Sequence, residues 1–189
     1  MGRRAVFLDR DGVLIRSYLR EGMPHPPVTL EKVEILPGVR EALRDLRDAG
    51  FKLLVVTNQP DVARGRQTRE MVERINSYLM DTLPLDGVYV CYHDNADGCT
   101  CRKPAPGMLL QAAGEHGIDL PSSFMVGDRG SDIAAGAAAG CRTILIEHPY
   151  SRCDQVKPTF KAADLRSAEC WVLSAEEKGR GLRTEDSEL

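Results

Sequence analysis

The chain has 189 residues, of which 42% are hydrophobic, and a formal net charge of −3 at pH 7. This length and apolar content support one substantial core, so we expect a single domain over residues 1–175. We also expect a monomer. The net charge gives no general attraction to nucleic acid. The longest apolar runs have only the length of a strand, and no signal-peptide pattern is found near Met1. We therefore expect a cytoplasmic protein without a membrane span.

The first predicted element is the apolar run 5–8, which suits a buried central strand. Asp9 would stand at its carboxyl end, where open α/β sheets bind ligands, and Asp11 and Gly12 follow it. Two such carboxylates suit a hard cation such as Mg²⁺, and one of them can act as a nucleophile on phosphorus. A polar turn after a strand would contain the same residues, so this segment alone leaves both interpretations open.

Residues 16–36 separate this strand from the next predicted element, a helix over 38–49. The rigid segment 23–27, with the sequence MPHPP, lies just beyond the first strand, and we hypothesise that it forms a wall of the substrate site. For His25 itself, an ordinary loop residue is the favoured interpretation. The helix contains an apolar stripe that indicates core packing, formed by Val39, Leu43 and Leu46.

Later segments repeat the order of an apolar run followed by reactive polar residues. The runs 51–56 and 124–126 predict two strands, and 86–92 and 142–147 predict two more. Helices are expected over 67–82, 106–116 and 131–139. This alternation predicts an α/β fold with a doubly wound parallel sheet of about five strands. The intervals between the motifs are too short for a large cap domain.

The polar residues that follow these runs suit phosphate chemistry. Hydroxyl and amide groups can hydrogen-bond a phosphoryl group, paired cations can balance its charge, and carboxylates can hold a metal. In chain order these residues are Thr57, Asn58 and Gln59, then Arg102 and Lys103, then Asp128, Arg129 and Asp132.

The ordered set DxDGV, TN, K and GDxxxD resembles the motifs of the haloacid dehalogenase (HAD) superfamily of phosphatases, over roughly residues 4–150. The resemblance implies the Rossmann-like HAD fold and a Mg²⁺-dependent hydrolysis of phosphate monoesters through an aspartyl phosphate. It also implies a role for each motif residue. These are Asp9 as nucleophile, Asp11 as general acid and base, Thr57 as phosphoryl ligand, Lys103 as neutralising cation, Asp9, Asp11 and Asp128 as Mg²⁺ ligands, and Asp132 as a support of the metal site.

Three cysteines and one histidine gather within eleven positions, at Cys91, His93, Cys99 and Cys101. Four such ligands suit tetrahedral Zn²⁺ and leave no open coordination position, so this metal would be structural. The alternatives are a disulfide or cysteines without a common role, but a bond between Cys99 and Cys101 would close a very tight loop. Lys103 follows this small zinc-binding loop directly, so zinc would stiffen the segment that presents the lysine.

The zinc loop and the Arg102–Lys103 pair resemble the same segment in one subgroup of this superfamily. The subgroup contains D-glycero-D-manno-heptose 1,7-bisphosphate phosphatases and histidinol-phosphate phosphatases. The segment 57–65 is similar to the TNQ-x-x-x-ARG pattern of the heptose enzymes, although Pro60 and Asp61 depart from it. The resemblance favours removal of the 7-phosphate from a heptose bisphosphate, with histidinol phosphate as the alternative substrate.

A bisphosphate has a second dianion, and arginine suits its recognition. The candidates for substrate binding are Asn58, Arg64, Arg66, Arg102 and Arg129, and the alternative for Arg64 and Arg66 is a pair of solvated loop charges.

Two other classes of function fit parts of the motif set. A phosphoacceptor signalling module also combines acidic residues with a threonine and a lysine, but it lacks a second aspartate at the position of Asp11. An inactive sugar-phosphate binder would not need all four motifs, so the complete motif set argues against this alternative.

The end of the chain has no catalytic pattern. Residues 169–173, around Trp171, predict a short terminal strand or a packing segment, and residues 176–189 predict a disordered tail. His148 has no partner at metal-ligand spacing.

Overall fold

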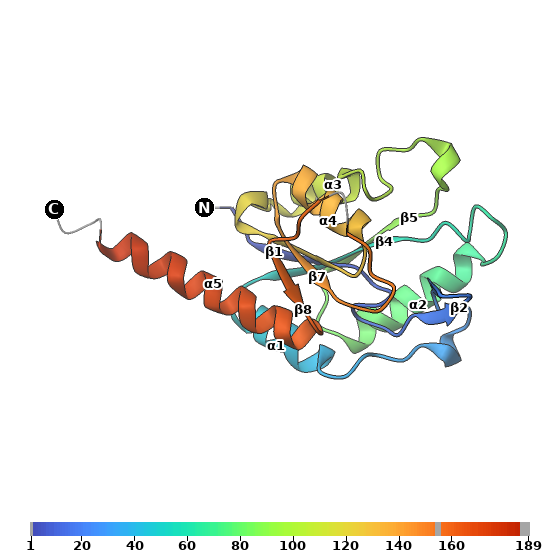
Figure 1. Cartoon of the computed structure of the whole chain (residues 1–189), viewed down its shortest axis with the longest axis horizontal. Helices are drawn as coiled ribbons and strands as arrows, with labels where there is room; N and C mark the ends of the chain where they lie inside the picture. The colour runs from blue at the N-terminus through green and yellow to red at the C-terminus, as the bar shows by residue number, and fades with distance from the viewer. Residues whose placement is uncertain (1, 154–155, 186–189) are drawn as a thin grey trace.

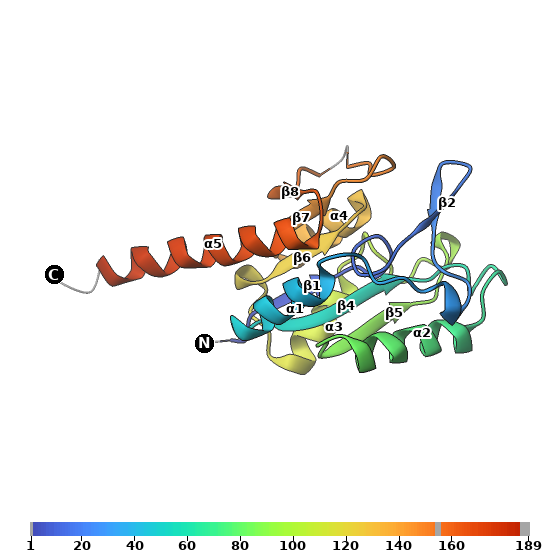
Figure 2. The same ribbon diagram turned by 90° about the horizontal axis from the view of Figure 1, so that it is seen from below.

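The computed structural model describes residues 2–153 and 156–185 of the chain. Its centre is a sheet of six parallel strands in the order β5-β4-β1-β6-β7-β8 (Figures 1 and 2). The strands are β1 (Ala5–Leu8), β4 (Lys52–Asn58), β5 (Gly87–Cys91), β6 (Phe124–Gly127), β7 (Arg142–Ile146) and β8 (Phe160–Ala162). The expected parallel α/β sheet is confirmed, with one strand more than the predicted five.

Five helices cover the two faces of this sheet in the described residues (Figures 1 and 2). The helices are α1 (Val39–Asp48), α2 (Arg69–Thr82), α3 (Gly107–His116), α4 (Gly130–Ala139) and α5 (Leu165–Glu185). Short 3₁₀ turns form η1 (Leu30–Lys32), η2 (Asn95–Asp97) and η3 (Leu120–Ser122). Between β1 and α1, the described chain adds only η1 and the antiparallel hairpin of β2 (Tyr18–Arg20) and β3 (Met23–His25).

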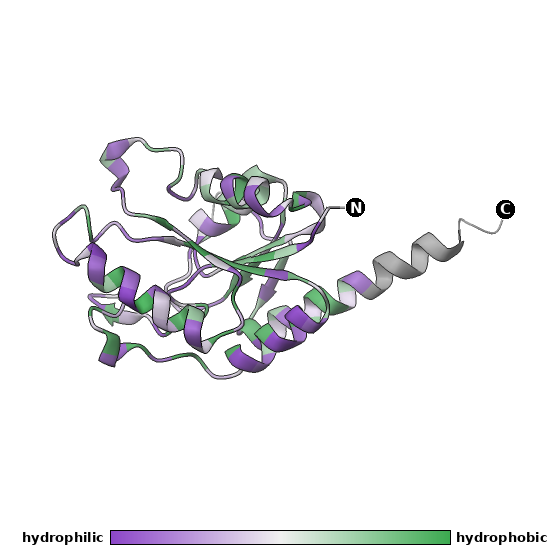
Figure 3. Ribbon diagram, turned by 180° about the vertical axis from the view of Figure 1, so that it is seen from behind, coloured by the Kyte–Doolittle hydropathy of each residue, from purple (hydrophilic) through white to green (hydrophobic). Residues whose placement is uncertain are grey.

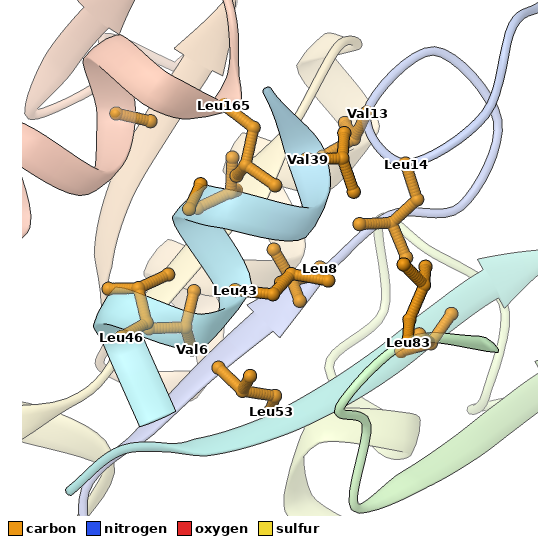
Figure 4. Packing of buried hydrophobic residues seen from close by; sticks show 14 of the residues in the cluster. Val6, Leu8, Val13, Leu14, Val39, Leu43, Leu46, Leu53, Leu83 and Leu165 are labelled. Carbon is orange, nitrogen blue, oxygen red and sulfur yellow. The ribbon is translucent and has the colours of Figure 1, made fainter. Parts of the chain in front are cut away.

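Alternation along β1 builds the two cores. Val6 and Leu8 face the helices α1, α2 and α5, whereas Ala5 and Phe7 face α3 and α4. All four residues are buried, as expected for a central parallel strand with both faces covered. Figure 4 shows Leu43 of α1 beside Leu8. Apolar residues accordingly concentrate on the strands and on the inner sides of the helices (Figure 3).

The segment around Trp171 lies within α5, so the predicted terminal strand is wrong and the packing alternative is correct. Leu165, Ala168 and Val172 are buried at helical spacing. The Trp171 ring stacks on Phe160 of β8, with ring centroids 4.9 Å apart. The apolar run 170–173 is too short to distinguish helix from strand by its sequence alone.

The predicted disordered tail, residues 176–189, overlaps with this helix. The structure continues α5 to Glu185, whereas residues 186–189 lie outside the described part of the chain. Alanine, glutamate, lysine, arginine and leucine are frequent after residue 174, and all of them favour helices. High polarity was therefore not evidence against a helix at this position. No helix in the described residues is long and apolar enough to cross a membrane.

Candidate active site

The carboxyl ends of β1, β4 and β6 bring the predicted motifs together in one cleft of about 420 Å³. The cleft is lined by Asp9, Asp11, Asn58, Lys103 and Asp132, among other residues. The hairpin also contributes Met23, Pro24 and His25, so the MPHPP segment does form a wall of this cleft. A groove of about 650 Å³ between α2 and β5 contains none of the motif residues.

Lys103 is buried at the centre of the site. Its Nζ lies 2.7 Å from Asp9 Oδ1 and 2.6 Å from Asp132 Oδ1, and it also donates to the Val56 carbonyl at 2.7 Å. Burial alone would lower the pKa of Lys103, but the two carboxylates outweigh it and raise that pKa. Lys103 therefore remains a cation beside the predicted nucleophile.

Asn58 holds the loop that presents this lysine. Its amide nitrogen donates to the Lys103 carbonyl at 2.9 Å, and its amide oxygen accepts from the Lys103 backbone nitrogen at 3.1 Å. Both ends of the amide are thus occupied within the protein. Asn58 also lines the cleft, where a substrate ligand was predicted. Its two hydrogen bonds, however, indicate that its main role is to position Lys103.

Asp11 has other partners than Lys103. Its carboxylate accepts from Gln59 Nε2 at 2.7 Å and pairs with the guanidinium of Arg10, at 3.0 Å between Nη2 and Oδ2. Gln59 also donates to Thr57 Oγ1 at 2.9 Å. This arrangement fixes the Asp11 carboxylate, which is not part of the group of carboxylate oxygens that could hold a metal ion.

That group consists of Asp9, Asp128 and Asp132, whose ligand oxygens lie within 4.8 Å of one another. Burial, together with the charges of Asp9 and Asp132, raises the pKa of Asp128 well above its usual range. Asp128 Oδ1 has no hydrogen-bond partner in the structure. Three carboxylates against the single ammonium of Lys103 leave two negative charges in excess when all are ionised. A divalent cation fits this site.

Asp132 differs from Asp128 because both of its oxygens are occupied. Oδ1 pairs with Lys103, and Oδ2 accepts from the Arg129 backbone nitrogen at 2.9 Å, at the start of α4. This geometry agrees with the predicted supporting role of Asp132.

The predicted zinc ligands also converge. The four sulfur and nitrogen atoms of Cys91, His93, Cys99 and Cys101 lie within 4.8 Å of one another, and the cysteines are unbridged. The Sγ atom of Cys101 lies 3.3 Å from that of Cys91 and 3.4 Å from that of Cys99. A tetrahedral zinc with bonds of about 2.3 Å to sulfur has sulfur–sulfur edges of about 3.8 Å. The cluster therefore has nearly the dimensions that this ion requires.

Three of the four predicted phosphate-binding arginines line the cleft, and they differ in their partners. Arg64 makes a bidentate pair with Asp94, at 2.8 and 2.5 Å. Arg102 instead donates to the side-chain oxygen of Asn95 at 2.7 Å and to the His93 carbonyl at 3.2 Å. Arg129 donates to the Pro24 carbonyl at 3.2 Å. Arg102 and Arg129 thus donate to neutral groups, but Arg129 also lies 4.0 Å from Asp128 Oδ1.

Asp61, one of the two residues that depart from the TNQ-x-x-x-ARG pattern, braces this loop. Its carboxylate lies 3.6 Å from Arg64 Nη1 and 4.0 Å from Arg66 Nη1. Its carbonyl accepts from the backbone nitrogens of Arg66 and Gln67. The added negative charge therefore faces the arginines of its own loop.

Several side chains of the site were not predicted from the sequence. Arg10 is completely buried and also donates to Asn76 Oδ1 of α2 at 2.8 Å. Tyr150 and Ser151 contact Asp128 from the loop after β7, at 2.8 and 2.7 Å. The only signal for Tyr150 was its place after a buried strand, at the edge of the sheet where ligands bind.

Comparisons with known proteins identify relatives of this chain. Residues 100–168 match the HAD-hydrolase-like family model. A D-glycero-beta-D-manno-heptose-1,7-bisphosphate 7-phosphatase from Helicobacter pylori (strain ATCC 700392 / 26695) is 38% identical over 156 residues, covering 77% of this chain and 86% of the relative. A relative of the same name from Escherichia coli (strain K12) is 38% identical over 183 residues, covering 90% of this chain and 88% of the relative.

A solved structure shows the same architecture. The crystal structure of D,D-heptose 1,7-bisphosphate phosphatase from B. bronchiseptica, complexed with magnesium and phosphate, has a TM-score of 0.79 at 27% identity. The match covers 91% of this chain and 99% of that chain. Fold and site thus define a HAD-type phosphatase, a phosphoric monoester hydrolase. Among these enzymes, the chain belongs to the family that contains the curated heptose bisphosphate phosphatases.

Proposed function

We propose that this enzyme removes the 7-phosphate from D-glycero-β-D-manno-heptose 1,7-bisphosphate and releases the 1-phosphate. The observation that carries this proposal is the match to curated phosphatases named for that substrate, at 38% identity over 90% of the chain. The cleft supports it, because buried acid and lysine groups for phosphoryl transfer lie beside several arginines.

We further propose that Asp9 and Asp128 hold Mg²⁺ and that the Cys₃His cluster holds structural Zn²⁺. The unpartnered Asp128 Oδ1 and the excess negative charge support the first site. Mg²⁺ would neutralise charge on the phosphoryl oxygens. Asp11 is the third predicted Mg²⁺ ligand, but its carboxylate contacts Arg10 and Gln59, and this favours the acid–base role.

The residues of the site suit a two-step displacement. A carboxylate oxygen of Asp9 attacks phosphorus, the bond to the sugar oxygen breaks, and protonated Asp11 gives its proton to that oxygen. A water then attacks the aspartyl phosphate, Asp11 takes a proton from this water, and the Asp9 oxygen leaves phosphorus. Lys103 and the hydroxyl of Thr57 would stabilise the charge on the phosphoryl oxygens in both steps.

The second phosphate of the substrate needs a cation at a distance from the reacting phosphorus. We assign this role first to Arg102, because its two described hydrogen-bond partners are neutral, whereas the guanidinium of Arg129 lies 4.0 Å from Asp128 Oδ1. Arg64 would have to exchange its pair with Asp94 for the phosphate. The zinc cluster would then support recognition as well as catalysis, since His93 itself accepts a hydrogen bond from Arg102.

The test is phosphate release with Mg²⁺ from both anomers of the heptose bisphosphate and from histidinol phosphate, with Asp9→Asn as the inactive control. We expect the β-bisphosphate to exceed histidinol phosphate in kcat/KM by about a hundredfold, which corresponds to ~2.7 kcal/mol of transition-state binding. Arg102→Gln should lower kcat/KM for the bisphosphate but not for histidinol phosphate, and it should thereby remove most of this preference. A preference of the native enzyme for histidinol phosphate would contradict the substrate assignment.

A further inference from the structure

The segment after β7, residues 148–151, reaches back over the two loops that carry the acidic motifs. The hydroxyl of Tyr150 donates to Asp128 Oδ2 at 2.8 Å, and the hydroxyl of Ser151 donates to the Asp128 carbonyl at 2.7 Å. His148 Nε2 lies 2.8 Å from the carbonyl oxygen of Gly12. The segment therefore ties the loop after β1 to the loop after β6.

Tyr150 makes the two oxygens of Asp128 different. Oδ2 accepts the phenol hydrogen bond, whereas Oδ1 is buried without a hydrogen-bond partner. The nearest guanidinium nitrogen to Oδ1, Arg129 Nε, is 4.0 Å away. A buried carboxylate oxygen without a partner costs free energy, so Oδ1 is the oxygen that gains most from a cation. The hydrogen bond at Oδ2 prevents the carboxylate from rotating away from that position.

His148 in turn orients the phenol ring. The two rings are stacked, with centroids 5.0 Å apart and planes 15° apart. A carbonyl oxygen can only accept, so the contact with Gly12 requires the proton on His148 Nε2. Gly12 leaves room for this packing, because a Cβ at its position would lie 2.8 Å from the Tyr150 hydroxyl oxygen.

We propose that Tyr150 is a positioning residue for the magnesium site, and that His148 holds its ring in place. The Tyr150 hydroxyl fixes Asp128 so that Oδ1 faces the cation. This inference rests on the proposed magnesium site, but it assigns a role to a segment outside the four motifs. Hydrogen-bond partners of metal ligands typically contribute 10- to 100-fold to metal affinity.

The experiment measures Mg²⁺ affinity of the full chain by calorimetry, and Mn²⁺ affinity by electron paramagnetic resonance. Tyr150→Phe should weaken both about 10- to 100-fold, with thermal unfolding of the metal-free protein almost unchanged. At saturating Mg²⁺, kcat should return close to that of the native enzyme, because the variant keeps every group that contacts substrate. His148→Gln, which changes a different side chain of the segment, should weaken binding by a smaller factor.

Tyr89→Phe is the matched control. Tyr89 also donates its hydroxyl to a carboxylate, that of Glu115 at 2.5 Å, but it lies on β5 outside the cleft. We expect no change in metal affinity for this variant. Affinity of Tyr150→Phe within twofold of the native value would overturn the positioning role while leaving the magnesium site intact. A native protein that binds neither cation would overturn the magnesium site itself, and the inference with it.

Discussion

The guanidinium of Arg10 is completely buried against the carboxylate of its neighbour in sequence, Asp11, which is the predicted acid and base of the reaction. Asn76 of α2 accepts from the other side of the guanidinium. Arg10, the middle residue of the DxD motif, thus connects the site to helix α2. The pair keeps the acid–base carboxylate in one position before substrate enters.

Removing this buried cation should destabilise the protein strongly. Arg10→Met leaves the Asp11 carboxylate buried without its charge partner, and breaking such a pair costs about 3–5 kcal/mol. Urea unfolding would measure the free energy of unfolding. Arg69→Met, which removes an exposed pair with Glu73 and a contact with the Tyr92 ring, should cost much less. Equal losses for the two variants would show that Arg10 is not a special position.

Gly12→Ala should abolish activity. An added Cβ would lie 2.2 Å from Asp128 Oδ2, and the backbone φ of +91° disfavours any side chain. The loop that contains Asp128 would have to move. Gly140→Ala is the control, since Gly140 has a φ of +89° and nothing within 4 Å of an added Cβ. Its cost should be the conformational strain of about 1–2 kcal/mol, with kcat/KM unchanged at a temperature where the variant is folded. A fully active Gly12→Ala enzyme would refute this packing.

The pair of Arg64 and Asp94 predicts a specific pH dependence. Hydrogen bonds from Arg64 and the Asn95 backbone lower the pKa of Asp94 to about 2. Because the folded-state pKa lies below the unfolded value, the pair stabilises the protein above pH ~4 and its contribution is lost as pH falls through about 2. Carbon-detected NMR titration of the Asp94 carboxyl should show this value. Arg64→Gln should raise the pKa of Asp94 towards its ordinary value, and an unchanged pKa would contradict the pairing.

Zinc removal should loosen the catalytic lysine. Cys99→Ser is expected to weaken zinc binding and lower Tm, and a loss of ~2 kcal/mol corresponds to roughly 4–8 °C for a chain of this size. The variant should also lower kcat, because Lys103 lies two residues beyond the last ligand, Cys101. Cys170→Ser, at an exposed position, provides the control. Metal analysis and calorimetry together distinguish the two variants, and an unchanged zinc content in Cys99→Ser would contradict the assignment.

The motif residues could be predicted because each follows an apolar run, and the carboxyl ends of parallel strands meet at one edge of the sheet. Asp9, Thr57 and Asp128 come together for this reason. The contacts of Tyr150 and Asn76 could not be predicted, because they depend on the paths of loops and on helix rotation. The strand β8 was missed because its three residues, Phe160–Ala162, are too few for a recognisable alternation. The sequence predicted which arginines lie near the cleft. It did not predict that Asp94 neutralises Arg64, because that pair joins two loops.

The central claim is that Asp9 accepts the phosphoryl group, and rapid acid quenching followed by peptide mass spectrometry tests it most directly. We predict that enzyme quenched during turnover carries phosphate on the peptide that contains Asp9, and that Asp11→Asn accumulates this species because it cannot activate the water. Asp9→Asn should carry no phosphate and release none. Phosphate on another residue, or turnover by Asp9→Asn at the native rate, would contradict the account.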